Sequence, residues 1–283
     1  MYQAKESGRN IYRFFTAKMN VDTLAQMQLH NQLRTALLHK EFELHYQPQI
    51  DLVNGSITGM EALIRWNQPG IGRISPAEFI PAAEASGLII PIGEWVLQEA
   101  CKQGQIWNKS GLQAFRVAVN LSALQFKRGN ILESVGKALE QSGLPSGMLE
   151  LELTESILLH DIDTALKTIR NLQALGVHLS IDDFGTGYSS MSYLKKLKVN
   201  KLKIDQSFVR DIVTDMDDLA IVRAIIQLGK TMQLRVIAEG VETVDQFQVL
   251  QENGCDEGQG YYFCKPLAAA ELTGWLSKNP LNN

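Results

Sequence analysis

Short apolar runs alternate with helical patterns along the chain from residue 42 onward. The first two runs, "FELHYQPQIDL" (42–52) and "ITGMEALIRW" (57–66), flank Asn54-Gly55, a dipeptide that favours the tight turn of a β-hairpin. Helical patterns follow, among them residues 161–176 and 215–232. Six further runs between such patterns have the length and apolar content of strands: "RVAVNLS", "LELELT", "VHLSID", "KLKID", "RVIAEG" and "GQGYYF".

Strands that alternate with helices are joined by right-handed crossovers and form a mostly parallel sheet. Eight strands in about 240 residues predict an α/β fold in which this sheet closes into a barrel. The opening hairpin makes one strand run antiparallel to its neighbour, so we expect a modified (β/α)8 TIM-type barrel with one antiparallel strand. The helical stretch at residues 21–40 precedes it, and we interpret it as a connector.

Composition limits which binding partners and which cellular compartment we expect. The 283 residues carry 27 basic and 31 acidic side chains, a net charge of -4 that argues against polymeric nucleic acid as a partner. Cys101, Cys255 and Cys264 have no metal-ligand spacing and leave one thiol over after any pairing, which favours the reducing cytoplasm. The longest apolar stretch contains Pro91 and Glu94, is too short to span a bilayer and follows no signal peptide. We expect no membrane contact.

Polar side chains recur where the predicted strands end, and functional groups of such barrels lie at the carboxyl ends of the strands. Singly, each has an ordinary explanation: Glu61 could pair with Arg65, and Asn120 could form a turn. Their recurrence at one end of successive strands instead predicts a shared site. The set contains five carboxylates, two amides and one amine: Glu61, Asn120, Glu152, Asp182, Asp183, Lys203, Glu239 and Gln259.

Asp182 and Asp183 stand side by side before the turn "GTG". Two unit charges about 4 Å apart repel by roughly 4 kcal/mol at an effective dielectric constant near 20, so either water screens the pair or a cation lies between them. Neighbouring strand residues point to opposite faces, so both can reach the mouth only where the strand pleat breaks down. Oxygen ligands without Cys or His point to Mg²⁺ or Mn²⁺. We predict a metal anchor.

Several ordered strings resemble the EAL domain family of cyclic di-GMP phosphodiesterases. The resemblance covers roughly residues 30 to 278 in the family's order, and the family's modified (β/α)8 barrel with one antiparallel strand agrees with the pattern above. The strings are "YQPQID", "EALIRW", "FIPAAE", "VNLS", "ELTES", "DDFGTGYSS", "KIDQSF", "AEGVE" and "QGYYFCKPL".

The resemblance implies hydrolysis of cyclic di-GMP to linear pGpG by a metal-activated water, with two Mg²⁺ or Mn²⁺ ions. Lys203 would orient or polarise that water, and Glu239 would also act as general base. The first ion would be held by Glu61, Asn120, Glu152 and Asp182, and the second by Asp182, Asp183 and Glu239. Substrate-binding positions would be Gln47, Leu63, Arg65, Asp183, Glu242, Gln259 and Pro266.

The resemblance also concerns the assembly and the chain's first residues. Glu155 matches a residue that braces the "DDFGTGYSS" loop, which in the family couples dimerisation to activity, so we expect a homodimer. The opening "MYQAKESGRN" resembles the carboxyl end of a GGDEF domain. We therefore divide the chain into residues 1–29, a GGDEF remnant with a linker helix, and 30–283, the EAL barrel. Gln49 and Gly258 depart from the family's usual apolar residues, and Met191 stands where leucine is common.

Two other functions are compatible with a polar barrel mouth. Some EAL-like domains have lost metal ligands and only bind the dinucleotide, but such a receptor should lack one of Glu61, Asp182, Lys203 or Glu239, and all four are present. An unrelated Mg²⁺-dependent barrel acting on a small carboxylic acid would need a base and a substrate clamp that the sequence does not offer.

Overall fold

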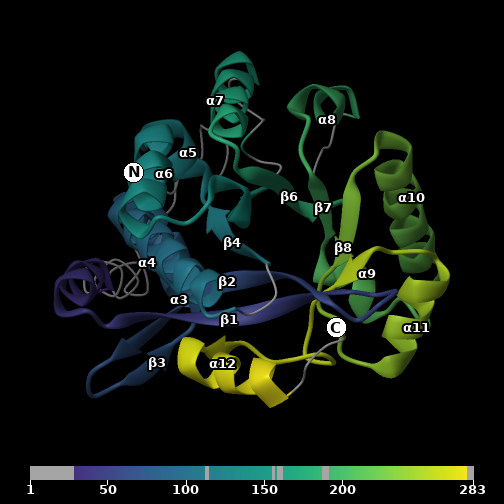
Figure 1. Ribbon diagram of the computed structural model, residues 1–283, viewed down its shortest axis with the longest axis horizontal. Coiled ribbons are helices and arrows are strands. Elements are labelled where there is room, and N and C mark those ends of the chain that lie inside the picture. The colour runs from purple at the N-terminus through teal and green to yellow at the C-terminus, as the bar shows by residue number, and fades with distance from the viewer. Residues whose placement is uncertain (1–28, 112–114, 155–156, 158–161, 187–190, 279–283) are drawn as a thin grey trace, which may run out of the picture.

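The computed structural model describes residues 29–111, 115–154, 157, 162–186 and 191–278. Strands fill the centre of the molecule, and helices surround them (Figure 1). The strands of the barrel are β1 (Phe42–Asp51), β2 (Ile57–Gln68), β4 (Arg116–Leu121), β5 (Leu149–Thr154), β6 (His178–Phe184), β7 (Lys201–Ile204), β8 (Arg235–Ala238) and β9 (Glu257–Gly258).

The sheet closes on itself, as predicted. Its order is β1-β9-β8-β7-β6-β5-β4-β2, and β2 pairs again with β1. Strand β1 runs antiparallel to both of its neighbours in the barrel, whereas the other barrel neighbours are parallel. Gly55 adopts a φ of +74° in the turn between β1 and β2, a conformation that glycine adopts without steric cost. The modified (β/α)8 barrel is therefore confirmed.

Helices cover the outer face of the barrel. The predicted helix at 215–232 is α10, which Asp215 caps by accepting the N–H groups of Asp217 and Asp218. No helix in the described part of the chain combines the length and apolar character that a bilayer crossing needs. The helices are α3 (Pro76–Ser86), α4 (Ile89–Lys109), α5 (Ala123–Arg128), α6 (Ile131–Ser142), the 3-10 turn η1 (Ser146–Met148), α7 (Ile162–Ala174), α8 (Met191–Leu197), α9 (Gln206–Arg210), α10 (Met216–Met232), α11 (Val244–Glu252) and α12 (Ala269–Lys278).

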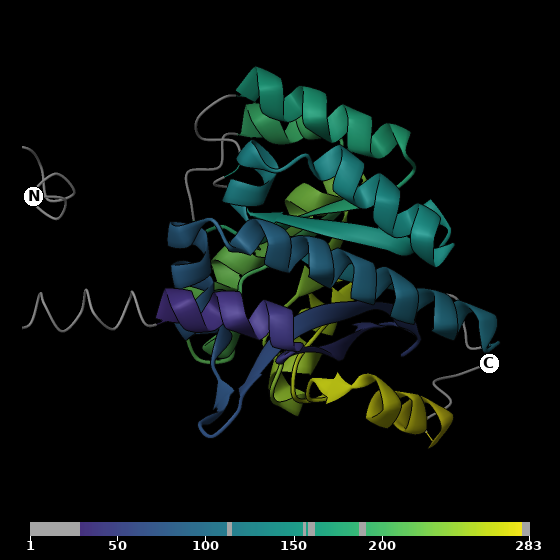
Figure 2. The same cartoon turned by 90° about the vertical axis from the view of Figure 1, so that its left-hand side faces the viewer.

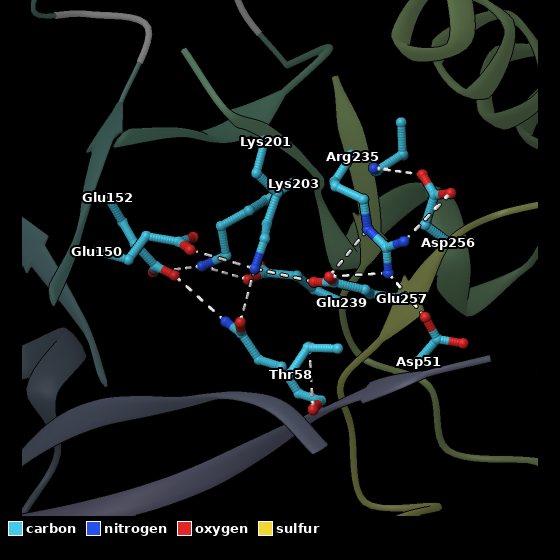
Figure 3. A network of polar contacts seen from close by, with 12 residues as sticks. Asp51, Thr58, Glu150, Glu152, Lys201, Lys203, Arg235, Glu239, Asp256 and Glu257 are labelled. Atoms are coloured by element: carbon cyan, nitrogen blue, oxygen red, sulfur yellow. Dashed lines mark hydrogen bonds and ion pairs between the residues drawn. The ribbon is translucent and has the colours of Figure 1, made fainter. Parts of the chain in front are cut away.

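The barrel strands are buried on both faces, but the two faces differ in chemistry. In β7, Leu202 and Ile204 belong to the apolar core, whereas Lys201 and Lys203 point into the barrel (Figure 3). Strand β5 repeats the pattern in "LELELT", with leucines in the apolar core and glutamates inside. Because side chains alternate with period two, inward residues two positions apart form stacked layers. The barrel thus encloses charged groups rather than the usual branched apolar layers.

The prediction for the last strand was wrong about its length. We expected a strand over residues 258–263, but β9 ends at Gly258, and the N–H groups of Phe263 and Cys264 both donate to the carbonyl of Gly260. A Cβ at Gly260 would lie 2.1 Å from the Val241 carbonyl oxygen, so the chain turns against the backbone of the loop after β8. Two short strands outside the barrel were not predicted: β3 (Gly72–Ile74), which pairs with β2, and β10 (Leu267–Ala268), which pairs with β1.

The predicted connector is described only in its second half. Residues 29–39 form a helix on the outside of the barrel (Figure 2), and its Leu33 and Ala36 are fully buried in the apolar core. The predicted GGDEF remnant falls almost entirely on residues 1–28, which lie outside the described residues.

Candidate active site

The centre of the site is Lys203, whose side chain is 1% exposed. Its Nζ lies 2.5 Å from Glu152 Oε2, 2.6 Å from Glu239 Oε1, 3.1 Å from Asp182 Oδ1 and 3.8 Å from Glu61 Oε1. These residues come from β2, β5, β6, β7 and the end of β8, and Figure 3 shows Lys203 between Glu152 and Glu239. The structure therefore brings together four of the five predicted carboxylates and the predicted amine.

Glu239 and Gln259 lie just beyond the ends of β8 and β9, and backbone hydrogen bonds hold them in line with these strands. The N–H of Glu239 donates to the carbonyl of Ile204, which continues the β7–β8 ladder by one residue. The N–H of Gln259 likewise donates to the carbonyl of Ala238. Both side chains consequently keep the inward alternation of their strands, and Gln259 Nε2 donates to Glu61 Oε2.

Asp182 and Asp183 reach the same mouth because the regular pairing of β6 with β7 is interrupted where they lie. The pairing of β6 with β7 shifts register between Ile181 and Phe184, and Asp183 adopts a φ of +54° in the left-handed region. Aspartate tolerates that region better than most residues, because its short polar side chain bonds locally. The carboxylates of Asp182, Asp183 and Glu239 each place one oxygen within 4.8 Å of the other two. The predicted breakdown of the pleat is confirmed.

Crowding of carboxylates alters their proton affinity. Burial raises the pKa of Glu239 to about 8, and the nearby Asp182 and Glu61 add to the rise. Burial and the neighbouring Asp182 and Asp205 raise the pKa of Asp183 to about 6. Burial also raises the pKa of Glu152 well above its usual value. The site therefore holds more negative charge than its ammonium neutralises, which is the condition under which acids either take up protons or bind a cation.

The pKa of Lys203 is also raised, although burial acts on an amine in the opposite direction. Burial lowers the pKa of its amine, but the charges of Asp182, Glu152, Glu239 and Glu61 outweigh burial and raise the pKa well above its ordinary value. The amine therefore stays protonated at neutral pH. An ammonium donates hydrogen bonds and accepts none.

Amides line the side of the site formed by β1, β2 and β4. Asn120 is exposed at the mouth, and its Nδ2 donates to Glu61 Oε1 at 2.6 Å. The buried Gln47 accepts a hydrogen bond from Gln259 Nε2 at 3.1 Å and donates to the carbonyl of Cys264 at 2.9 Å. These contacts put Asn120 and Gln259 against the carboxylate cluster, where the strand-end pattern predicted them, and Gln47 lies beside Gln259.

The remaining predicted positions lie around that cluster or outside the described residues. Leu63 and Arg65 are half-buried further along β2, and the half-buried Pro266 offers its carbonyl oxygen to His45 Nδ1 at 3.3 Å. Glu242 is exposed in the loop after β8, where its backbone N–H donates to Gln246 Oε1 at 2.7 Å. Glu155 lies outside the described residues.

A second polar layer lies beneath the first, and we did not predict it. Lys201 Nζ lies 2.9 Å from Glu257 Oε2, 3.3 Å from Glu150 Oε2 and 2.9 Å from Gln49 Oε1. Arg235 Nη2 reaches the other oxygen of Glu257 at 3.1 Å (Figure 3). The sequence does contain a signal for this layer, because four of its residues stand two positions from a predicted site residue along the same segment: Gln49, Glu150, Lys201 and Glu257.

Comparison with known proteins decides the family. The model of the EAL domain matches residues 30–266. The chain belongs to the EAL domain family. Within this EAL chain, the match spans the strands that carry Lys203 and its four carboxylates.

Named relatives resemble nearly the whole chain. It is 47% identical over 96% of its length to the bifunctional diguanylate cyclase/cyclic di-GMP phosphodiesterase MucR of Pseudomonas aeruginosa, and 43% identical over 98% to the cyclic di-GMP phosphodiesterase NbdA of the same organism. The chain spans only 40% and 35% of the length of these proteins. The solved PaMucR phosphodiesterase in complex with c-di-GMP superimposes with a TM-score of 0.84, covering 87% of this chain and 99% of that one.

Proposed function

We propose that this EAL domain is a metal-dependent phosphodiesterase that hydrolyses cyclic di-GMP to linear pGpG. The observation that carries the proposal is the gathering of Glu61, Glu152, Asp182 and Glu239 around one buried ammonium at the mouth of the barrel. Relatives named as cyclic di-GMP phosphodiesterases support the choice of substrate.

The residues of the site fit a divalent cation. Their donors are oxygens, and three carboxylates converge within 4.8 Å. Burial, together with the neighbouring acids, raises the pKa values of Asp183 and Glu239. Such a donor set suits Mg²⁺ or Mn²⁺. Bound there, these ions would lower the pKa of a water and offset charge on the phosphate. By the family's pattern, one ion would be held by Glu61, Asn120, Glu152 and Asp182, and a second by Asp182, Asp183 and Glu239.

Lys203 and Glu239 would have different roles toward the attacking water: the first orients it and the second accepts its proton. Because Lys203 keeps its proton, it holds the water by donating to the water's oxygen and cannot act as the base. Glu239 would take the water's proton, once bound cations have displaced the proton that its raised pKa otherwise retains. Its carboxylate lies 2.6 Å from Lys203 Nζ and, with 19% of its side chain exposed, is the most accessible of the four. The water oxygen bonds to phosphorus, the P–O3′ bond breaks, and the released O3′ takes up a proton.

Other parts of the chain support binding and regulation in this proposal. Gln47, Leu63, Arg65, Pro266 and Glu242 would line the dinucleotide pocket together with Asp183 and Gln259. Glu155 would brace the "DDFGTGYSS" loop and couple dimerisation to turnover. Residues 1–29 would be the end of a GGDEF domain, the rest of which would lie in a longer cytoplasmic protein.

Incubation of the purified chain with cyclic di-GMP and Mn²⁺ or Mg²⁺, followed by chromatography of the nucleotides, tests the proposal. We expect pGpG to form with either ion and not in excess EDTA, with Asp182→Asn as the inactive control. Tight binding of cyclic di-GMP without pGpG would instead identify a receptor. Light scattering coupled to size-exclusion chromatography tests the proposed homodimer.

A further inference from the structure

Gln49 connects the lower polar layer to the proposed metal site. It lies on β1, is completely buried, and makes one contact in each layer. Its Oε1 accepts a hydrogen bond from Lys201 Nζ at 2.9 Å, and its Nε2 donates to Glu152 Oε1 at 3.4 Å. Glu152 Oε2 faces Lys203. Both oxygens of this buried carboxylate are therefore held from different directions.

Lys201 fixes which end of the Gln49 amide faces Glu152. An ammonium can only donate, so it must face the amide oxygen, and the amide nitrogen is then the end presented to the carboxylate. Glu150 and Glu257 hold Lys201 in place with contacts of 3.3 and 2.9 Å. The orientation of the amide is thus set by charges that lie outside the mouth.

The neighbouring strand leaves space for this amide. Gly59 on β2 is the register partner of Gln49, and a Cβ built on Gly59 would lie 2.6 Å from Gln49 Oε1. Any side chain at position 59 would push the amide away from the line between Lys201 and Glu152. Gly59 and Gln49 therefore form one unit in which the glutamine occupies the volume that the glycine leaves open.

We propose that Gln49 is a positioning residue that holds the Glu152 carboxylate in its metal-binding orientation from below. This inference rests on the proposed function, in which Glu152 is a metal ligand. Hydrogen-bond partners of metal ligands typically contribute about 10-fold to 100-fold in metal affinity. The Gln49–Glu152 contact is long for a hydrogen bond. We therefore expect weakened ion binding rather than its loss.

The test measures the Kd of Mn²⁺ for the full chain by electron paramagnetic resonance of the free ion, without nucleotide. Gln49→Met removes the amide and keeps most of the volume, whereas Gly59→Ala keeps the amide and displaces it. The control is Gln173→Met. In the parent, the Gln173 amide donates to the carbonyls of Leu197 and Lys198, away from the carboxylate cluster. Thermal unfolding of each variant records any general loss of stability.

We expect both test variants to bind Mn²⁺ about 10-fold to 100-fold more weakly than the parent, while Gln173→Met loses stability and binds Mn²⁺ like the parent. A folded Gln49→Met protein with a Kd within about twofold of the parent overturns the positioning role. If Gln49→Met does not fold, the same result for Gly59→Ala overturns it. A parent that binds Mn²⁺ but forms no pGpG refutes the phosphodiesterase alone, because the Kd comparison needs no turnover. A parent that binds no Mn²⁺ overturns both.

Discussion

Replacement of Lys203 by methionine removes the ammonium from the centre of four carboxylates and keeps an unbranched side chain of similar length. Two effects should follow, and they respond differently to metal ions. The variant should lose stability because buried carboxylates lose their counter-ion, and it should lose turnover because the attacking water loses its donor. Saturating Mn²⁺ should reduce the first effect and leave the second.

The structure sets the size of both effects. The ammonium lies 2.5, 2.6 and 3.1 Å from the carboxylates of Glu152, Glu239 and Asp182 and is almost wholly buried. Loss of one partner from a buried ion pair costs about 3–5 kcal/mol. We expect the free energy of unfolding of Lys203→Met to fall by this amount at about pH 8 in EDTA. Loss of a single donor aimed at developing charge lowers kcat by about 100-fold to 1000-fold. Mn²⁺ should bind at least as tightly as to the parent, because a like charge has been removed.

Urea unfolding with and without Mn²⁺, and the rate of pGpG formation at saturating Mn²⁺ and substrate, measure these quantities. Leu172→Ala is the control for stability, since Leu172 is fully buried in α7 and its truncation costs about 2–5 kcal/mol without touching the cluster. We expect this control to keep the parent's kcat. A Lys203→Met protein whose kcat lies within about threefold of the parent would refute the orienting role of Lys203.

Three other predictions concern the same end of the barrel. Asp182→Asn should lower pGpG formation by more than about 100-fold, because it removes a proposed ligand shared by two ions; parental turnover with unchanged Mn²⁺ occupancy contradicts this. In EDTA the urea midpoint of unfolding should fall as pH rises from about 5 to about 9, because the folded state keeps the extra proton of Glu239 only below its pKa of about 8. Glu239→Gln should make the midpoint depend less on pH, and a pH dependence equal to that of the parent contradicts this prediction. Gly260→Ala should cost about 3 kcal/mol in urea unfolding, because its Cβ would lie 2.1 Å from the Val241 carbonyl oxygen; a parental midpoint contradicts it.

Periodicity predicted the parts of the fold that depend on local pattern. The alternation in "LELELT" predicted a strand, and the order of strands and helices predicted the closed barrel with one antiparallel strand. The adjacency of Asp182 and Asp183 predicted a break in the pleat, because only such a break lets both face one site. These inferences succeeded because a two-residue period and a tight turn are properties of a few neighbouring residues.

Features that depend on distant contacts were not predicted. Residues 258–263 resemble a strand in sequence, but Gly260 packs against the backbone of Val241, and the chain turns there. The lower layer was missed for a related reason. Lysine in a strand is ordinarily a surface residue whose charge reaches water. Only the closed barrel places Lys201 between Glu150 and Glu257.

The two layers differ in charge balance, and that difference separates a binding site from an internal support. In the upper layer, four carboxylates share one ammonium and Asp183 lies at the same mouth, which leaves four formal negative charges. In the lower layer, the two deeply buried carboxylates of Glu150 and Glu257 face Lys201 and Arg235, so the buried acids are matched by cations. Asp51 and Asp256 pair with Arg235 nearer the surface. A buried ion pair with balanced charge has little to gain from an added cation, whereas crowded carboxylates must protonate or bind one. Strand β7 carries a lysine into each layer, and the number of acids around each ammonium decides which layer can bind a metal ion.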